Sequence, residues 1–361
     1  MKKKVAIILS NFEGGGAERV VSNIIRYLDQ DKIELKIILL EKKGVYLKSI
    51  PENIEIIDLN CKRARYSIKK LIKAINSFEP EVIFSAMGQL NLIISAMRMF
   101  YKGNPSIIVR EDNTPSKKLA DMKKVKGGLF KVLYKILYPC VDLIIAQCES
   151  MRKDMIDNIG INGEKIKVIY NPVDILKISR EKDLYNPYNN NNINLVAVGR
   201  LVYQKGFDIL IDAFKRVNDK IPNVRLTILG DGKLLEDLNK KIDKYNLSDS
   251  VTIESFKENP YPYINYADTF ILSSRWEGFP NVLLEALACD TKVVATDCKS
   301  GPREILGDNT WGLLVKENDS EELAKGIIRS INTKKNENTR ALDYDVQKIV
   351  KIYQEIFLTI N

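Results

Sequence analysis

The chain has 361 residues, enough for roughly two domains, and 45% of its residues are hydrophobic and 29% charged. These ordinary globular values argue against a disordered, collagenous or integral-membrane protein. The absence of histidine removes His-based catalytic triads, metal sites and proton shuttles. Five cysteines without a C-x-x-C pair indicate neither a disulfide framework nor a zinc site, and they fit a reducing cytoplasm best.

Short runs rich in Ile and Val alternate with helical patterns in both halves. The apolar run at residues 5–9 is too short for a signal peptide or a membrane span, so it predicts a first buried strand. Further strands are predicted at residues 35–40, 54–58, 82–85, 107–110, 143–146 and 167–170, with helices at 17–28, 68–78 and 128–137. After a polar stretch at 185–192, a predicted linker, strands resume at 195–198, 225–229, 251–253, 269–272, 292–295 and 312–315.

These strand runs are apolar throughout rather than alternating. Such runs indicate parallel strands that are covered on both faces, and hence an α/β fold with two doubly wound domains. Ligands of doubly wound domains bind at the carboxyl ends of the strands. We therefore expect two domains that face each other across a cleft, with the site in that cleft.

The net charge of +9 is placed unevenly. Residues 1–180 hold 32 Lys and Arg against 20 Asp and Glu, whereas residues 181–361 hold 24 against 27. Basic clusters at 62–73 and 117–135 are either solvated helix faces or surfaces that attract the phosphates of lipid or nucleic acid. The second cluster is interleaved with apolar residues, which favours a membrane, and no zinc-finger or RNP motif supports nucleic acid. The predicted membrane patch comprises Lys123, Lys124, Lys126, Phe130, Lys131 and Tyr134.

Two segments carry the features of phosphate sites. Gly14 to Gly16 follow the first strand and open a helix, where glycine admits a ligand close to the backbone and helix amides attract anions. The triplet is not G-x-G-x-x-G, so a tight strand-to-helix turn is the alternative. Arg200 and Lys205 follow the strand at 195–198, and such a pair of cations suits the binding of a diphosphate. The alternative is that both are solvated surface charges.

Residues 273–290 form the most informative segment. Pro280 suits the first turn of a helix, which places Glu277 in the loop ahead of that helix and Glu285 inside it. The first N–H groups of a helix have no partner within the helix, so the amides of Phe279, Asn281 and Val282 can donate to a ligand. We expect one carboxylate to reach sugar hydroxyls and the deeper one to hold a ribose, the alternative being a surface loop with an ordinary helix carboxylate.

Taken together, four motifs resemble the family 4 retaining glycosyltransferases of the GT-B type. They are Gly15-Gly-Ala-Glu-Arg19, Gly199-Arg200 with Lys205-Gly206, Glu277-Gly-Phe-Pro with Glu285, and Ser300-Gly-Pro-Arg-Glu304. The resemblance is strongest to bacterial enzymes that add N-acetylhexosamine, often N-acetylgalactosamine (GalNAc), to undecaprenyl-diphosphate-linked sugars. It implies an acceptor-binding, membrane-facing domain at 1–180 and a nucleotide-sugar domain at 181–340. A final helix within 341–361 is expected to cross back to the first domain.

The resemblance also implies a role for each matching residue. The predicted catalytic residues are Arg200, Lys205 and Glu277, and the donor is expected to contact Gly15, Gly16, Gly278, Phe279, Asn281, Val282 and Glu285. On the acceptor side we expect Glu18, Arg110, Glu111 and Asp112, in a region where many relatives carry a histidine. Asp290 stands where relatives have the glycine that ends the helix, and aspartate adopts the left-handed conformation less readily.

The expected ligands are a UDP-sugar and a lipid-linked oligosaccharide, with no metal, no cofactor and no nucleic acid. A protein with this function is expected in the cytoplasm, attached peripherally to the inner face of the membrane. Three other functions stay open: a UDP-sugar epimerase or hydrolase of the same fold, a glycan- or lipid-binding module with a decayed site, and a Rossmann dehydrogenase. An intact set of charged residues, Arg200, Lys205, Glu277 and Glu285, argues against a decayed binding module. The lack of G-x-G-x-x-G argues against a dehydrogenase.

Overall fold

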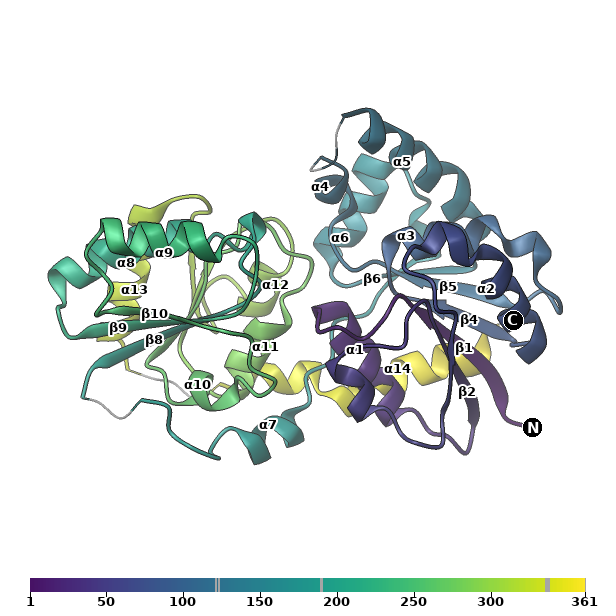
Figure 1. Ribbon diagram of the computed structural model, residues 1–361, viewed down its shortest axis with the longest axis horizontal. Helices are drawn as coiled ribbons and strands as arrows, with labels where there is room; N and C mark the ends of the chain where they lie inside the picture. The colour runs from purple at the N-terminus through teal and green to yellow at the C-terminus, as the bar shows by residue number, and fades with distance from the viewer. Residues whose placement is uncertain (121, 123, 189–190, 335–337, 361) are drawn as a thin grey trace. The chain divides into compact units, whose positions relative to one another are not determined.

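The computed structural model describes residues 1–120, 122, 124–188, 191–334 and 338–360 (Figure 1). The chain divides into two compact units, the first made of Met1–Pro172 and Val346–Asn361 and the second of Val173–Asp345. In the described part of the chain, no helix is long and apolar enough to cross a membrane.

The first unit is built on a parallel sheet that has seven strands among the described residues. The strands are β1 (Lys3–Leu9), β2 (Ile33–Leu39), β3 (Glu55–Asp58), β4 (Val82–Ser85), β5 (Ser106–Arg110), β6 (Leu143–Ala146) and β7 (Ile166–Val168). Their order is β3-β2-β1-β4-β5-β6-β7, so the chain reverses its direction of travel between β1 and β4. β1 and β4 are therefore the switch point at which doubly wound sheets bind ligands.

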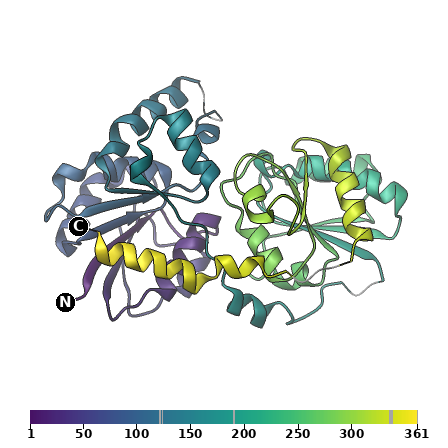
Figure 2. The same cartoon turned by 180° about the vertical axis from the view of Figure 1, so that it is seen from behind.

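Helices cover this sheet on both faces. They are α1 (Gly16–Tyr27), α2 (Ala64–Phe78), α3 (Gly88–Ala96), α4 (Pro115–Ala120), α5 (Lys124–Leu137), α6 (Glu149–Asp154) and α14 (Val346–Thr359). Helices α1 and α14 lie side by side and share one apolar core with β1 (Figures 1 and 2). Tyr353 and Phe357 of α14 pack their rings on Phe84 of β4, with centroids 5.8 and 5.5 Å away. The last helix is thus part of the core of the first unit.

The second unit has a parallel sheet with the strand order β10-β9-β8-β11-β12-β13 in the residues that the structure describes. Its strands are β8 (Ile193–Val198), β9 (Val224–Leu229), β10 (Val251–Glu254), β11 (Thr269–Leu272), β12 (Val293–Thr296) and β13 (Leu313–Val315). Its helices are α7 (Ile175–Glu181), α8 (Phe207–Lys220), α9 (Leu235–Lys244), α10 (Tyr261–Asn265), α11 (Asn281–Ala288), α12 (Pro302–Leu306) and α13 (Ser320–Asn332). Helices α8, α9 and α13 share one core on one face, and α10 and α11 lie on the other (Figure 1).

Both sheets confirm the predicted α/β fold with two doubly wound domains, and each predicted strand lies within two residues of an observed one. The predicted boundary at residue 180 is wrong by several residues. Helix α7 belongs to the second unit because it packs on α10 and α11, and Asn259 Nδ2 donates to the carbonyl of Glu181 at 3.2 Å. The polar stretch predicted as a linker lies inside the second unit, and two of its residues, 189 and 190, fall outside the described residues.

Candidate active site

The loops that follow β8 and β11 carry the predicted catalytic residues of the second unit. These strands are neighbours in the sheet, paired through Thr269 with Leu195 and Phe270 with Val196. Their order marks the switch point of this sheet, so both loops leave the same carboxyl edge side by side. The fold therefore brings together two motifs that are about 70 residues apart in the chain.

Lys205 and Glu277 form an ion pair at this edge. Lys205 Nζ lies 2.6 Å from Glu277 Oε1, and the two side chains are only 16% and 7% exposed. The Ser274 hydroxyl donates to the same carboxylate oxygen at 2.6 Å. A buried carboxylate needs such partners, because an isolated charge is costly to bury. The structure thus brings together two of the three predicted catalytic residues.

The turn that carries Lys205 is fixed to the neighbouring loop by its backbone. Ser273 Oγ donates to the Lys205 carbonyl at 2.8 Å. Gly206 then adopts φ of +63°, and a Cβ at this position would collide with the Ser273 carbonyl oxygen. Only glycine combines this left-handed conformation with so close an approach. The K-G pair of the motif therefore has a structural cause: glycine lets the Lys205 turn lie directly on the end of β11.

Arg200, the third predicted catalytic residue, follows β8 and is exposed. Within the described residues, its guanidinium makes no hydrogen bond or ion pair with another side chain. Lys205 is already engaged by a carboxylate, whereas Arg200 presents an uncompensated positive charge at the same edge of the sheet. The two cations therefore differ in their setting, a difference that the sequence pattern does not reveal.

Helix α11 places the remaining donor residues. The helix begins at Asn281, so Pro280 stands at its N-cap, one residue before the expected first turn. Glu285 is 4% exposed, and Phe279 is equally buried, with its ring 5.5 Å from that of Tyr344. The Phe279 side chain is therefore a packing group, and only its backbone is suited to a ligand. Asn281 and Val282 are partly exposed, while Gly278 is buried.

Asp290 ends this helical segment in the left-handed conformation, with φ of +57°. Its amide donates to the Leu287 carbonyl at 2.9 Å, and the amide of Thr291 donates to Ala286 at 3.0 Å. This is the backbone geometry for which glycine is normally preferred. The prediction that aspartate can take this conformation is confirmed.

The glycine loop of the first unit lies at the start of α1. Gly15 is the N-cap residue of this helix, and Glu18 stands in its first turn. The Glu18 carboxylate lies so close over Gly15 that a Cβ there would collide with it. A carboxylate at this position is stabilised by the partial positive charge of the helix start. The loop therefore already accepts an anionic group, that of its own Glu18.

The residues predicted for the acceptor side are mostly buried. Arg110 ends β5, is fully buried and donates a hydrogen bond to Asn171. Glu111 is also fully buried, and Asp112, which is partly exposed, pairs with Lys118 at 2.8 Å. The expectation that Arg110 and Glu111 present their side chains to an acceptor is therefore wrong for this structure. Arg110 is the last residue of a fully buried strand and Glu111 follows it, and both side chains are packed inside the first unit.

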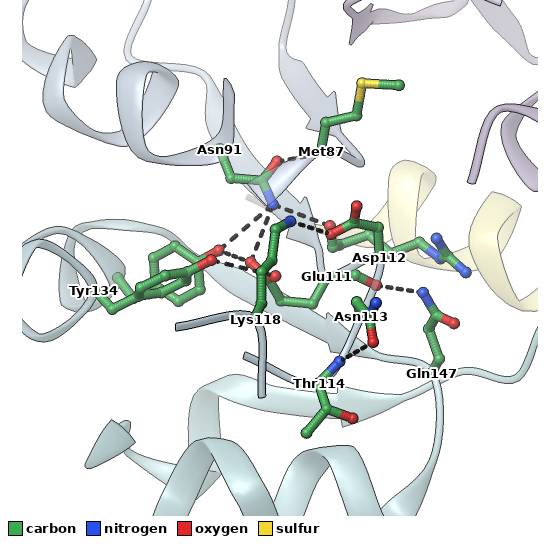
Figure 3. Close-up of polar contacts among 11 residues, drawn as sticks. Met87, Asn91, Glu111, Asp112, Asn113, Thr114, Lys118, Tyr134 and Gln147 are labelled. Atoms are coloured by element: carbon green, nitrogen blue, oxygen red, sulfur yellow. Dashed lines mark hydrogen bonds and ion pairs between the residues drawn. The ribbon is translucent and has the colours of Figure 1, made fainter. Parts of the chain in front are cut away.

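Glu111 is the centre of a buried polar network (Figure 3). It accepts hydrogen bonds from the Tyr138 hydroxyl, from Tyr134 at 3.4 Å and from Asn91 Nδ2 at 3.4 Å. Burial raises the pKa of its carboxyl to about 7, even though Lys118 and the hydrogen bonds act in the opposite direction. The pKa of Lys118 is itself raised, because the nearby Asp112 and Glu111 outweigh its own burial.

The predicted membrane patch lies on α5 and requires correction. Tyr134 is 2% exposed, because it faces inward onto Glu111 and packs against Tyr138 with ring centroids 4.7 Å apart. Lys126 and Lys131 are exposed, and Phe130 is half-buried with Lys126 Nζ 5.8 Å from its ring centre. Lys123 and the side chain of Lys124 lie outside the described residues. The outer face carries instead three exposed apolar residues at helical spacing, Leu129, Val132 and Ile136.

Two doubly wound sheets, with a charged carboxyl edge on the second, are the architecture that the resemblance to GT-B glycosyltransferases predicts. Residues 14–176 match the family described as Glycosyltransferase Family 4, and residues 180–345 match Glycosyl transferases group 1. The chain belongs to this family of GT-B glycosyltransferases.

Two relatives and one solved structure illustrate the likeness. The chain is 32% identical, over 97% of its length and 98% of the relative's, to the N-acetylgalactosamine-N,N'-diacetylbacillosaminyl-diphospho-undecaprenol 4-alpha-N-acetylgalactosaminyltransferase of Campylobacter jejuni. It is 30% identical to an uncharacterized glycosyltransferase of Methanocaldococcus jannaschii, over 78% of this chain and 80% of that one. Its fold is similar to that of Anabaena HepE in complex with UDP-glucose, with a TM-score of 0.82 at 22% identity over 99% and 100% of the two chains.

Several residues around the candidate site escaped the sequence reasoning. Ser274 holds Glu277, and Arg275 binds Asp208 with two hydrogen bonds of 2.9 and 2.7 Å. In the first unit, Asn91 and Tyr138 enclose Glu111. The polar run 273–275 at the end of a buried strand was a usable signal for the first group, because polar residues there line the ligand edge of a parallel sheet.

Proposed function

We propose that this glycosyltransferase moves an N-acetylhexosamine, with GalNAc as the best choice, from a UDP-sugar to an undecaprenyl-diphosphate-linked oligosaccharide. The proposal includes retention of the anomeric configuration and independence from metal ions. The observation that carries it is the charged edge of the second sheet, where Arg200 is exposed beside the Lys205–Glu277 pair. The Campylobacter relative supports the sugar and the acceptor through the activity that its name states, and UDP-glucose in HepE supports the donor class.

The charges at this edge have complementary tasks in the proposed reaction. Breaking the anomeric C–O bond leaves negative charge on the departing diphosphate, which Arg200 and Lys205 stabilise as fixed cations. Side-chain cations take the place that a divalent metal has in other transferases. Glu277 is then shared between Lys205 and the hydroxyls of the transferred sugar, while Glu285 holds the ribose. In this scheme the leaving phosphate accepts the proton of the acceptor hydroxyl, so no histidine is needed.

Helix α5 supports the proposed location at the cytoplasmic leaflet. Its outer face combines exposed Lys126, Lys131 and Lys135 with the apolar Leu129, Val132 and Ile136. Lysines attract anionic headgroups, and apolar side chains at i, i+3 and i+7 enter the acyl boundary together. A lipid-linked acceptor lies in that plane, so docking of this helix brings the enzyme to its substrate.

The decisive experiment incubates the protein with a panel of UDP-sugars and extracted lipid-linked oligosaccharide, followed by mass spectrometry of the lipid. We expect a single N-acetylhexosamine increment with UDP-GalNAc, in EDTA as in its absence, and an α-linkage by NMR. Release of free sugar without transfer would identify a hydrolase instead. Loss of transfer in EDTA that Mg²⁺ restores would contradict the metal-independent mechanism.

A further inference from the structure

Two aromatic residues stand immediately before the predicted catalytic pair. Tyr203 lies two residues ahead of Lys205, and Trp276 lies one residue ahead of Glu277. Their ring centroids are 6.0 Å apart, and the ring planes are tilted by 54°. Tyr203 is 60% exposed, although a large aromatic side chain gains stability from burial. An exposed ring beside a charged site therefore calls for a physical explanation.

The exposed ring is held in place by Arg275. The guanidinium lies 3.9 Å from the centre of the Tyr203 ring, and Arg275 Nη1 donates to the carbonyl of Tyr203 at 2.7 Å. Asp208 in turn accepts from both terminal nitrogens of Arg275 at 2.9 and 2.7 Å. Burial alone would raise the pKa of Asp208, but the Arg275 hydrogen bonds and charge lower it, so the pair stays ionised at neutral pH. One face of the ring is thus covered by a fixed cation.

The turn of Trp276 is joined to the same structure. Gln204 Nε2 donates to the Trp276 carbonyl at 2.9 Å, and the amide of Arg275 donates to the Gln204 carbonyl at 2.8 Å. The two aromatic residues consequently sit on turns that are tied to each other and to Lys205 and Glu277. Such an arrangement orders the two turns before any ligand arrives, which lowers the entropy cost of binding.

We propose that Tyr203 and Trp276 form an aromatic platform that binds a pyranose ring of the acceptor glycan. This inference rests on the proposed transfer to a glycan acceptor. The face of an aromatic ring is electron-rich, and the apolar face of a pyranose presents polarised C–H groups that pack on it. Lys205 and Glu277, which serve the donor, are nearly buried at 16% and 7%, whereas Tyr203 is 60% exposed. The acceptor is therefore the substrate that meets the platform.

The first test is steady-state kinetics of Tyr203→Ala and Trp276→Ala with a lipid-linked acceptor. We expect the acceptor KM to rise roughly tenfold, as for loss of one stacking partner, with UDP affinity unchanged. Tyr203→Phe, which keeps the ring, should behave as wild type, and Tyr203→Leu, which keeps only bulk, should not. Tyr266 provides the matched control, because it is a tyrosine of the same unit that is 38% exposed. It lies between α10 and the amino end of β11, at the edge of the sheet opposite to the candidate site. Tyr266→Ala should leave both constants unchanged.

The second test measures binding without turnover. The chain has two tryptophans, so Trp311→Phe leaves Trp276 as the only fluorophore of this kind. We expect methyl α-N-acetylgalactosaminide to change its fluorescence saturably in the presence of UDP, and Tyr203→Ala to abolish that change.

The outcomes separate the platform from the proposed transfer. A fluorescence change without transfer from any UDP-sugar would support the platform and contradict the transferase assignment. Normal transfer with an unchanged acceptor KM in both alanine variants would overturn the platform alone. If the alanine variants lost UDP affinity as strongly as acceptor affinity, the platform would also be overturned, because the rings would then serve the donor.

Discussion

At the scale of single residues, Arg200 and Lys205 carry the same charge in different surroundings. Arg200 is exposed, so Arg200→Ala should lower kcat/KM by about 100- to 1000-fold, the effect of losing one donor to a developing anion. The free energy of unfolding should change by less than about 0.5 kcal/mol, as for an ordinary surface substitution. Kinetics and urea unfolding on the same preparation check both parts. Near-normal turnover would remove Arg200 from the phosphate site.

Lys205→Ala should reduce both turnover and stability. The substitution removes the cation that faces the Glu277 carboxylate, which is only 7% exposed, and keeps the hydrogen bond from the Ser274 hydroxyl. An uncompensated buried partner costs roughly 1 to 3 kcal/mol. The double variant Lys205→Ala with Glu277→Gln should recover part of that stability but none of the activity. Equal stability of the single and double variants would mean that the Glu277 carboxylate costs no stability when Lys205 is removed.

Glu111 should make the stability of the first unit depend on pH. Its carboxyl pKa is raised from 4.5 to about 7 by burial, so the folded protein holds this proton more tightly than the unfolded chain. The stabilisation is complete below pH 4.5 and is lost as the pH rises toward 7, a difference of about 3 kcal/mol. Relative to Glu111→Gln, the wild type should therefore lose stability across this window.

Urea unfolding of both proteins at half-unit pH intervals measures this effect. Glu52→Gln is the matched control, because it makes the same substitution at an exposed carboxylate of the same unit, and its profile is compared with wild type in the same way. If the wild type and Glu111→Gln ran parallel, Glu111 would titrate in the folded protein as it does in water.

At the scale of elements, the end of α11 tests the cost of an aspartate in a glycine conformation. Asp290 has φ of +57°, which costs a residue with a Cβ about 1 kcal/mol, somewhat less for aspartate. Asp290→Gly should therefore raise the free energy of unfolding by about 0.5 kcal/mol, whereas Asp290→Ala should lower it. Thermal unfolding at constant pH ranks the three proteins. A glycine variant less stable than the alanine variant would show that side-chain contacts of Asp290 outweigh its backbone strain.

The elements themselves were largely predictable, and the orientation of their side chains was not. Buried parallel strands such as β4 and β11 are apolar throughout, so their sequence marks them directly. Helix α5 is apolar on two faces, with Tyr134 inward and Leu129, Val132 and Ile136 outward. Periodicity finds such a helix but does not tell which face meets the sheet. The sequence pattern therefore places Tyr134 on the surface, whereas the structure buries it.

The candidate site was predictable in its members but not in its contacts. Motif spacing singled out Lys205 and Glu277, yet their ion pair joins residues 72 positions apart and exists only once β8 and β11 are neighbours. Arg110 shows the opposite failure, because a charged residue at a strand end is expected near solvent and here lies in the core. Such contacts depend on tertiary packing, which a local pattern does not encode.

At the scale of the whole molecule, the excess of positive charge lies in residues 1–180, and this distribution predicts binding to anionic membranes. Each lysine near an anionic surface contributes about 1 kcal/mol, so Lys126, Lys131 and Lys135 together should retain the protein on vesicles at low salt. Reversing all three to glutamate should abolish co-flotation with vesicles that contain anionic lipid. The charge-matched control reverses three exposed lysines of the second unit, Lys220, Lys240 and Lys244, and should float as wild type.

The apolar stripe gives the same surface a second, salt-insensitive contribution. Serine at Leu129, Val132 and Ile136 removes three side chains that are 51 to 61% exposed, without changing the charge. Since burial of such side chains in the acyl boundary is hydrophobic, this variant should bind weakly even at low salt, whereas high salt should only partly release the wild type. Flotation at several salt concentrations distinguishes the two contributions. Binding that ignored lipid charge and survived both sets of substitutions would show that α5 is an ordinary solvated helix and that another surface meets the membrane.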